Sequence, residues 1–307
     1  MEPQVVIGSR RGEVSPAGER GPTAGADNRG GSSIEPKLTA AHEITSIMGV
    51  PFDAIDEETL VQLVVERASA GEGGWVVTPN LDIVRKFRSS RESRDLILAA
   101  THRVADGQPI VWASRLAGMP LPERVAGSDL AQSLPRAAAR AGLSVFLLGG
   151  NPGVAAAAAR RLRSRFPGLL QVHSHCPPFG FGDDSGELER IKAMLLRARP
   201  ALVLVGLGFP KQEKLISTLR AVLPGTWFVG VGIALSFLAG EQARAPVALQ
   251  RLGLEWLYRV IQEPRRLAGR YARTNPRFVV RLAAQYARVW RPNPSTTIAP
   301  GVEELYA

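Results

Sequence analysis

Short apolar runs alternate with longer amphipathic segments between about residues 40 and 240 of this 307-residue chain. Continuous apolar strands that alternate with helices are typical of a parallel sheet covered on both faces. The sequence therefore predicts an α/β fold with a doubly wound, mainly parallel, Rossmann-like sheet. The predicted strands are 75–80, 102–107, 143–150, 169–174, 201–208 and 226–232, and the clearest helical patterns are 56–70, 127–142, 152–168 and 185–200.

The composition changes on both sides of this α/β core, which we place at residues 39–240. Residues 1–38 are rich in Gly, Ser, Pro and Ala and have few large apolar residues, so we expect a disordered leader. Residues 241–291 contain no strand-like run and have the pattern of basic amphipathic helices broken at Pro264 and Pro276. Residues 292–307 are expected to form a flexible tail.

The net charge of +10 is concentrated in the C-terminal appendage. Residues 242–291 contain eleven arginines and two acidic residues, whereas the charges of residues 1–40 cancel. A helical path would align Arg259, Arg266, Arg270 and Arg273 in one basic stripe beside apolar and aromatic faces. Such a segment is expected to bind an anionic partner, and a lipid surface and nucleic acid are the candidates.

The sequence has neither the long apolar segment of a membrane-spanning helix nor the apolar stretch of a signal peptide. Its single cysteine, Cys176, cannot form an internal disulfide. Both features predict a cytoplasmic protein, which the basic appendage would attach to the inner face of the membrane.

In an open parallel sheet, ligands bind beyond the carboxyl ends of the strands. The residues that follow the predicted strands are therefore the candidates for a binding site. They are Thr78, Asn80, Asp106, Gln108, Gly149, Gly150, Gly208, Lys211, Gln212 and Gly232.

Two of these turns, within 147–153 and 205–213, are glycine-rich and lead from a strand into a helix. Pro152 and Pro210 suit first helical turns, where free backbone N–H groups can bind phosphate. Close packing of helix on strand is an equally good explanation of the glycines. Neither turn has the dinucleotide or Walker pattern. Lys211 and Gln212, expected to be exposed at the helix start, could contact a nucleotide or a sugar.

Asp106 has two interpretations at this stage. A carboxylate at a strand end can remove a proton from an alcohol, as a direct-displacement transfer requires. An Asp before a helix can equally be the helix cap, and caps are the more common case.

The sequence contains two weak metal signals. The aspartates of 182–187 (GDDSGE) suit a helix cap better than a metal site, and His173, His175 and Cys176 have no second cluster of ligands to complete a zinc site. We therefore predict no metal and no cofactor.

Six motifs together make the chain similar to a known family. They are VVTPNLDIV, RVADGQPIVW, PLPERVAGSDL, VFLLGGNPGVA, LVLVGLGFPKQE and GVGIALSFLAGEQARAP with the following LGLEWLYRVIQEPRRLAGRY. In this order and spacing the sequence resembles the WecG/TagA/CpsF family, glycosyltransferase family 26, over roughly residues 44–271.

The resemblance implies an inverting, metal-independent glycosyltransferase of cell-surface polysaccharide synthesis. Its donor would be a UDP-sugar carrying N-acetylmannosamine, its uronic acid or glucose, and its acceptor a polyprenyl-diphosphate-linked saccharide. The resemblance makes Asp106 the general base, with Thr78 and Asn80 in the same pocket, Arg124 facing a diphosphate and Gln212 contacting substrate. Arg259, Arg266 and Arg270 would meet the membrane and the acceptor diphosphate. Relatives also suggest self-association through the core.

One position departs from the family pattern, since Ser236 stands where many relatives have Asp. The identity of the donor sugar therefore stays open. The main alternative function is a non-catalytic binder of membranes or nucleic acid that acts through the basic appendage. A nucleotide-dependent oxidoreductase is disfavoured because the dinucleotide pattern is missing.

Overall fold

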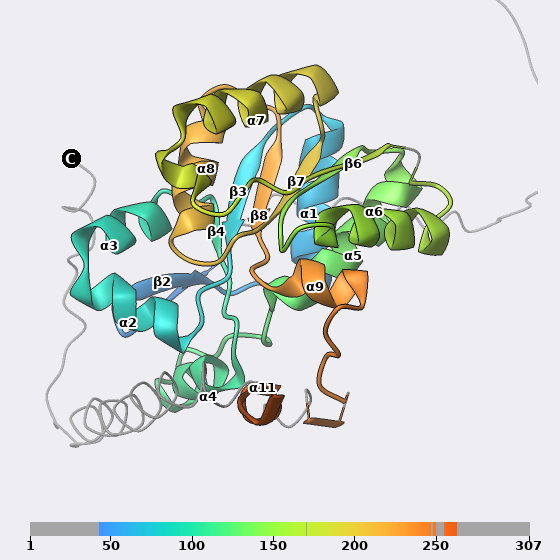
Figure 1. Cartoon of the computed structure of the whole chain (residues 1–307). Helices are drawn as coiled ribbons and strands as arrows, with labels where there is room; N and C mark the ends of the chain where they lie inside the picture. Colours follow the sequence, from blue (N-terminus) through green and yellow to red (C-terminus); the bar gives the residue numbers. More distant parts are fainter. Residues whose placement is uncertain (1–42, 170, 247, 250–254, 263–307) are drawn as a thin grey trace, which may run out of the picture. The chain divides into compact units, whose positions relative to one another are not determined.

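A computed structural model describes residues 43–169, 171–246, 248–249 and 255–262. The predicted parallel sheet is confirmed: six strands lie in the order β4-β3-β8-β7-β5-β6, and every neighbouring pair is parallel (Figure 1). The strands are β3 (Gly74–Val77), β4 (His102–Arg103), β5 (Val145–Gly149), β6 (Val172–His175), β7 (Leu202–Gly206) and β8 (Trp227–Gly230).

Both faces of the sheet are buried, because successive side chains of a strand point to opposite faces. The pairing register aligns Trp75, Phe228 and Val203 on neighbouring strands, and the residues that follow them, Val76, Val229 and Leu204, are aligned in the same way. All six side chains are buried. The first row belongs to a large apolar cluster with helices on that face, and the second row faces the opposite layer.

Helices cover the two faces in separate groups (Figure 1). The apolar cluster joins one face to α2 (Leu81–Ser89), α3 (Arg91–Leu98), α4 (Gln108–Leu116), α7 (Ser185–Ala198) and α8 (Lys211–Arg220). The other group consists of α1 (Glu57–Ser69), α5 (Gly127–Ala141), α6 (Val154–Arg165) and α9 (Ala234–Ala239), which pack on one another. The four helical patterns read from the sequence correspond to α1, α5, α6 and α7.

A two-stranded antiparallel hairpin, β1 (Ile44–Ile47) and β2 (Val50–Asp53), precedes the sheet and was not predicted. Asp53 at its end accepts hydrogen bonds from the backbone N–H of Arg103 at 2.8 Å and from the His102 ring at 3.1 Å. These bonds attach the hairpin to β4. The hairpin thereby fixes the strand that leads to Asp106.

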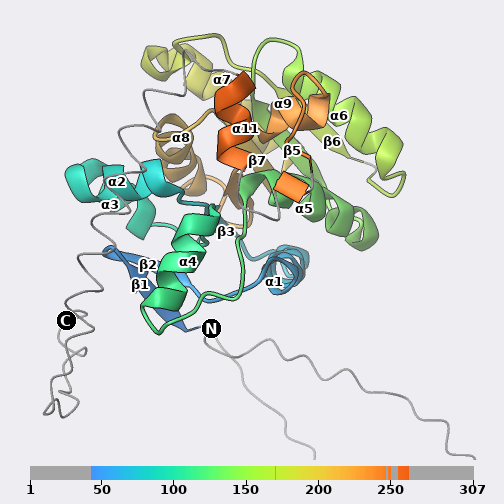
Figure 2. The ribbon, with the colours of Figure 1, turned by 90° about the horizontal axis from the view of Figure 1, so that it is seen from below.

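The carboxyl ends of the strands share one edge of the sheet, which Figure 2 views directly. The helix α11 (Glu255–Gln262) lies across this edge, between α4 and α9. No helix in the described part of the chain combines the length and apolar character that crossing a bilayer requires. The predicted leader 1–38 and tail 292–307 lie outside the described residues, as does most of the appendage 241–291.

Candidate active site

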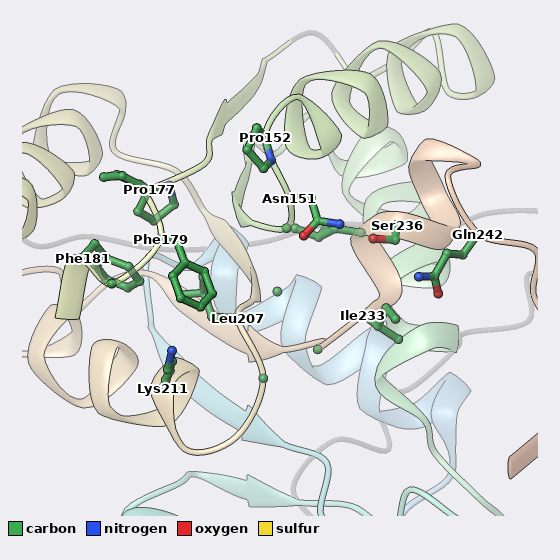
Figure 3. A pocket seen from close by; sticks show the side chains of 17 residues that line it. Asn151, Pro152, Pro177, Phe179, Phe181, Leu207, Lys211, Ile233, Ser236 and Gln242 are labelled. Atoms are coloured by element: carbon green, nitrogen blue, oxygen red, sulfur yellow. The ribbon is translucent and has the colours of Figure 1, made fainter. Parts of the chain in front are cut away.

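The pocket at the carboxyl edge of the sheet has a volume of about 370 Å³. Turns after four strands line it, as Figure 3 shows for the labelled side chains. Four residues predicted from the sequence line the pocket, namely Gly150, Gly208, Lys211 and Gly232. Gly149, which was also predicted, is the last residue of β5, just before the pocket. The lining comprises Gly150–Pro152, Pro177–Phe181, Gly206–Gly208 with Lys211, Gly232 and Ile233, Leu235 and Ser236, and Gln242.

The ring of Phe179 stands at the mouth of this pocket and is fully exposed. The ammonium group of Lys211 lies 5.2 Å from the centre of that ring. A flat apolar ring beside a cation is a surface on which a base can stack next to a charged phosphate. Sequence reasoning missed Phe179 because it lies in the loop after β6, away from the glycine motifs.

Gln212 is buried, contrary to the prediction that it is exposed at the start of α8. Its side-chain Oε1 accepts hydrogen bonds from the backbone N–H groups of Gly208 at 3.0 Å and Gly232 at 3.2 Å. Its Nε2 donates to Glu213 at 2.8 Å. The amide therefore joins the turns after β7 and β8 from beneath the pocket. Lys211, the preceding residue, is exposed as expected.

Pro152 and Pro210 also do not occupy the first helical turns in which the sequence predicted them. Pro210 is the N-cap of α8, and Pro152 lies two residues before Val154, where α6 begins. Neither proline is in the first helical turn.

Asp106 follows β4 and is held beside the residues that follow β3. Its backbone N–H donates to the carbonyl of Pro79 at 3.1 Å. Its carboxyl is 31% exposed, so a ligand could reach it. The N-cap of α4 is Gly107, with φ 144°, and Gln108 is the first helical residue. Asp106 thus lies one residue before the N-cap of α4 and not at the cap position itself.

Thr78 and Asn80 flank Pro79 and have structural contacts of their own. The buried hydroxyl of Thr78 donates to the carbonyl of Gly230 at 3.4 Å, which links the end of β3 to the end of β8. The side chain of Asn80 accepts from the N–H groups of Asp82 and Ile83, so that it caps α2. Both residues lie at the predicted edge, and Gly232 of the pocket is two residues beyond Gly230.

Arg124 lies close to Asp106. The backbone N–H of Val125 donates to the carbonyl of Ala105 at 2.9 Å, which aligns the two segments. The Arg124 guanidinium is 3.9 Å from the Asp106 carboxylate and donates to Asp129 at 2.8 Å. A cation at this position can bind an anionic group next to the carboxylate.

Sequence reasoning missed a second arginine in this cluster, Arg244. Its guanidinium pairs with Asp129 at 2.6 Å and with Glu255 of α11 at 3.3 Å. Glu255 also lies 3.9 Å from Arg124. Burial acts to lower the pKa of Arg244, but these carboxylates outweigh it and raise the pKa. The cluster thereby connects α11 to the candidate catalytic edge.

The remaining candidate residues either have a structural role that explains them or lie outside the described residues. Asp184 accepts from the N–H groups of Gly186 and Glu187 and is the N-cap of α7, which confirms the helix-cap interpretation of 182–187. The side chain of Arg259 and the whole of Arg266 and Arg270 lie outside the described residues.

The side chains of the second possible metal site, His173, His175 and Cys176, also make ordinary structural contacts. His175 binds Glu187 at 2.6 Å, His173 stacks on Phe146, and Cys176 donates to the carbonyl of Gly150 at 3.1 Å. Across the described ranges, no group of three or more His, Cys, Asp and Glu side chains has an arrangement suited to a metal ion.

Known proteins are similar to this chain over most of its length. The sequence matches the Glycosyl transferase WecG/TagA/CpsF family over residues 45–292. Curated relatives from Staphylococcus aureus strains MW2 and NCTC 8325 / PS 47 are each 33% identical over 244 residues, which cover 77% of this chain and 91% of theirs. A third, from strain MRSA252, is 32% identical over the same coverage. All three are named N-acetylglucosaminyldiphosphoundecaprenol N-acetyl-beta-D-mannosaminyltransferase. With a match that spans the whole sheet, the edge pocket and Arg124 with Asp106, the chain belongs to the WecG/TagA/CpsF family of glycosyltransferases.

Proposed function

We propose that this glycosyltransferase transfers N-acetylmannosamine from a UDP-sugar to a polyprenyl-diphosphate-linked N-acetylglucosamine in cell-surface polysaccharide synthesis. The names of the relatives support this sugar and this acceptor. The uronic acid of N-acetylmannosamine and glucose are the other donor sugars to test. Family membership favours an enzyme over a non-catalytic binder.

The edge pocket is the proposed donor site. Its glycine turns precede α6 and α8, and helix starts offer backbone N–H groups and a positive dipole end to a diphosphate. Lys211 adds a positive charge, and the exposed ring of Phe179 suits stacking by uracil. The combination suits a nucleoside diphosphate better than a neutral sugar alone.

Asp106 is the proposed general base. Its carboxylate would accept the proton of the acceptor hydroxyl while that oxygen forms a bond to the anomeric carbon of the donor. The bond from that carbon to the β-phosphate oxygen breaks on the opposite side, so the configuration inverts and UDP leaves. The proximity of Asp106 to the Arg124 cation is the observation that carries this assignment.

Cationic side chains and backbone N–H groups would stabilise the two diphosphates of this reaction without a metal ion. Lys211 and the glycine turns serve the leaving UDP, and Arg124 serves the lipid diphosphate next to Asp106. We therefore expect activity to persist in a chelator such as EDTA.

The basic appendage is the proposed membrane contact. Residues 242–291 carry a net charge of +9, and each arginine near an anionic bilayer contributes about 1 kcal/mol of attraction. A few such residues are enough for reversible attachment to the inner face of the cytoplasmic membrane. The enzyme would then meet its lipid-linked acceptor at the membrane surface.

The test of the reaction is the release of UDP from a panel of UDP-sugars in the presence of a prenyl-diphosphate N-acetylglucosamine. UDP-N-acetylmannosamine should be the best donor. Asp106→Asn should lower kcat by roughly 10²- to 10⁴-fold, because a general base typically contributes that much. Asp95→Asn, which neutralises an exposed carboxylate on α3, is the matched control. Wild-type turnover by Asp106→Asn would refute the assignment of the base.

Membrane attachment is tested separately with anionic vesicles at low and high salt. The triple variant of Arg259, Arg266 and Arg270 to Gln should bind more weakly than the wild type. A control triple of Arg136, Arg140 and Arg197 to Gln removes the same charge from exposed positions on α5 and α7. Equal binding by the two triples would contradict a specific role for the appendage.

A further inference from the structure

Glu213 is a buried carboxyl in α8 that the proposed reaction leaves unused. Its side chain has 0% exposure, and only one of its oxygens, Oε1, receives a hydrogen bond from another side chain, the amide of Gln212. The second oxygen, Oε2, is buried and has no hydrogen-bond partner among the described residues. Such a group normally needs a reason to be present, because burying a carboxyl without full hydrogen bonding is unfavourable.

The partner of Glu213 is the residue that joins the pocket turns. Gln212 can accept from both Gly208 and Gly232 only when its Oε1 points toward them. Its Nε2 then points to Glu213, and an acceptor at that place fixes the orientation of the amide. The pair also packs on Gly230, where an added Cβ would lie 2.5 Å from the Gln212 Nε2 and 3.2 Å from Glu213 Oε1.

Few charges face Glu213 from the elements around it. Strands β3, β7 and β8 contain no titratable side chain. On α2, Lys86 acts on Glu213 through its charge and is paired with Asp82 at 3.1 Å. On α8 itself, the nearby Lys214 pairs with Glu92 of α3. A negative charge on Glu213 would therefore be compensated mainly by one lysine that is already shared.

We propose that Glu213 is a positioning residue of the donor pocket: it orients the Gln212 amide that holds the two glycine turns, and its negative charge opposes an anionic ligand there. The inference rests on the proposed nucleoside diphosphate donor. It assigns no contact between Glu213 and the substrate, since Gln212 lies between them.

The charge of Glu213 should change near neutral pH. Burial raises its pKa to about 7, against the hydrogen bonds from Gln212 and its own backbone and the charge of Lys86. The neutral form predominates below this pH and still offers Oε1 to Gln212. Binding of a diphosphate should raise the Glu213 pKa further, so affinity should fall as the pH rises through 7. Each unit by which ligand binding raises the Glu213 pKa corresponds to about a tenfold loss of affinity at high pH.

The first experiment measures the affinity of UDP by calorimetry between pH 6 and pH 8. Glu213→Gln keeps an acceptor for Gln212 but carries no charge at any pH. We expect it to bind UDP like the wild type at pH 6 and severalfold more tightly than the wild type at pH 8. The ionisation of UDP itself affects both proteins equally. Glu92→Gln, which removes an exposed carboxylate beside α8, should retain the wild-type pH dependence. Identical pH dependence of the wild type and Glu213→Gln would overturn the role of the charge.

The second experiment needs no ligand and measures amide hydrogen exchange of the peptides that contain Gly208 and Gly232. Glu213→Ala removes the acceptor, so both turns should exchange faster, whereas Glu213→Gln should exchange like the wild type. Equal exchange in all three proteins would overturn the positioning role. If Glu213→Ala does not fold, the comparison of Glu213→Gln with the wild type still tests the role of the charge. If no protein binds UDP, the donor assignment fails, and hydrogen exchange alone decides whether Glu213 positions the turns.

Discussion

The guanidinium of Arg124 lies 3.9 Å from the carboxylate of Asp106. The two residues come from separate loops, and the hydrogen bond from Val125 to Ala105 holds those loops side by side. A carboxylate and a cation therefore meet at the edge of the sheet. From this pairing we expect Arg124 to have two roles, which are to bind an anionic group and to orient the carboxylate.

Replacement of Arg124 should affect catalysis more than folding. We expect Arg124→Gln to lower kcat/KM for the lipid acceptor by roughly 10²-fold, since one charged donor to the reacting groups is lost. Arg124→Lys should restore only part of this, because an ammonium cannot make the same forked contacts with Asp106 and Asp129. Initial rates at varied acceptor concentration measure both effects, with Arg136→Gln as an exposed arginine control. Full activity of Arg124→Lys would show that a point charge is sufficient.

The edge of the sheet was predictable because it depends on topology. Continuous apolar runs identify parallel strands, and the residues after them, including Asp106 and Gly232, must then share an edge. The β1–β2 hairpin was missed because each strand has only four residues and its turn, Met48–Gly49, is not one of the common hairpin sequences.

Contacts between distant side chains were not predictable in the same way. Arg244 pairs with Asp129, which is 115 positions earlier in the chain, and no local pattern indicates such a partner. The burial of Gln212 was missed for a related reason. A polar residue at a helix start is usually exposed, and only the structure reveals the two backbone N–H groups that its amide accepts.

Arg244 should be important for the attachment of α11. Arg244→Gln removes the closer of the two cations that contact both Asp129 and Glu255 and leaves only Arg124, so we expect faster hydrogen exchange of residues 255–262 and a loss of about 2 kcal/mol in the free energy of unfolding. Arg67→Gln removes an exposed ion pair with Glu72 and should change the stability by less than about 1 kcal/mol. Unchanged exchange in α11 would contradict the role of Arg244.

Asp53 should make stability depend on acid pH. Burial acts to raise its pKa, but hydrogen bonds from His102 and the Arg103 N–H, together with their charges, lower it below its ordinary value of 3.8. The unfolded chain then holds more protons than the folded chain between the two pKa values, so the stabilising contribution is complete above about pH 4 and is lost as the pH falls through the folded pKa.

Asp53→Asn should therefore be less stable than the wild type at neutral pH by about 1 to 3 kcal/mol, the range for hydrogen bonds to a charged group. The difference should shrink as the pH falls below 4. Urea unfolding between pH 3 and pH 7 measures both quantities, with Asp95→Asn as the exposed control. A constant difference across this range would show that the Asp53 charge has no part in attaching the hairpin.

Gly230 should tolerate no side chain. A Cβ at this position would lie 2.5 Å from the Gln212 amide nitrogen, too close for either group to stay in place. We expect Gly230→Ala to displace Gln212, lower the thermal stability and weaken UDP binding. Gly182→Ala is the matched control, because an added Cβ there meets no atom within 4 Å. UDP affinity that is equal in both variants would contradict the coupling of Gln212 to the pocket.

Phe179 should determine affinity for the nucleotide rather than the chemical step. The ring is exposed at the mouth of the pocket and makes its close cationic contact with Lys211, so its removal leaves the buried core unchanged. Stacking of a base on an aromatic ring contributes about 1 to 3 kcal/mol. Phe179→Ala should therefore raise the Kd of UDP and the donor KM by roughly 10-fold or more, with kcat and the acceptor KM unchanged, and Phe179→Trp should preserve binding. Leu196→Ala removes an exposed apolar side chain from α7 and should leave all four constants unaltered. If Phe179→Ala instead raised the acceptor KM alone, the pocket would belong to the acceptor, and the donor would have to bind elsewhere along the edge.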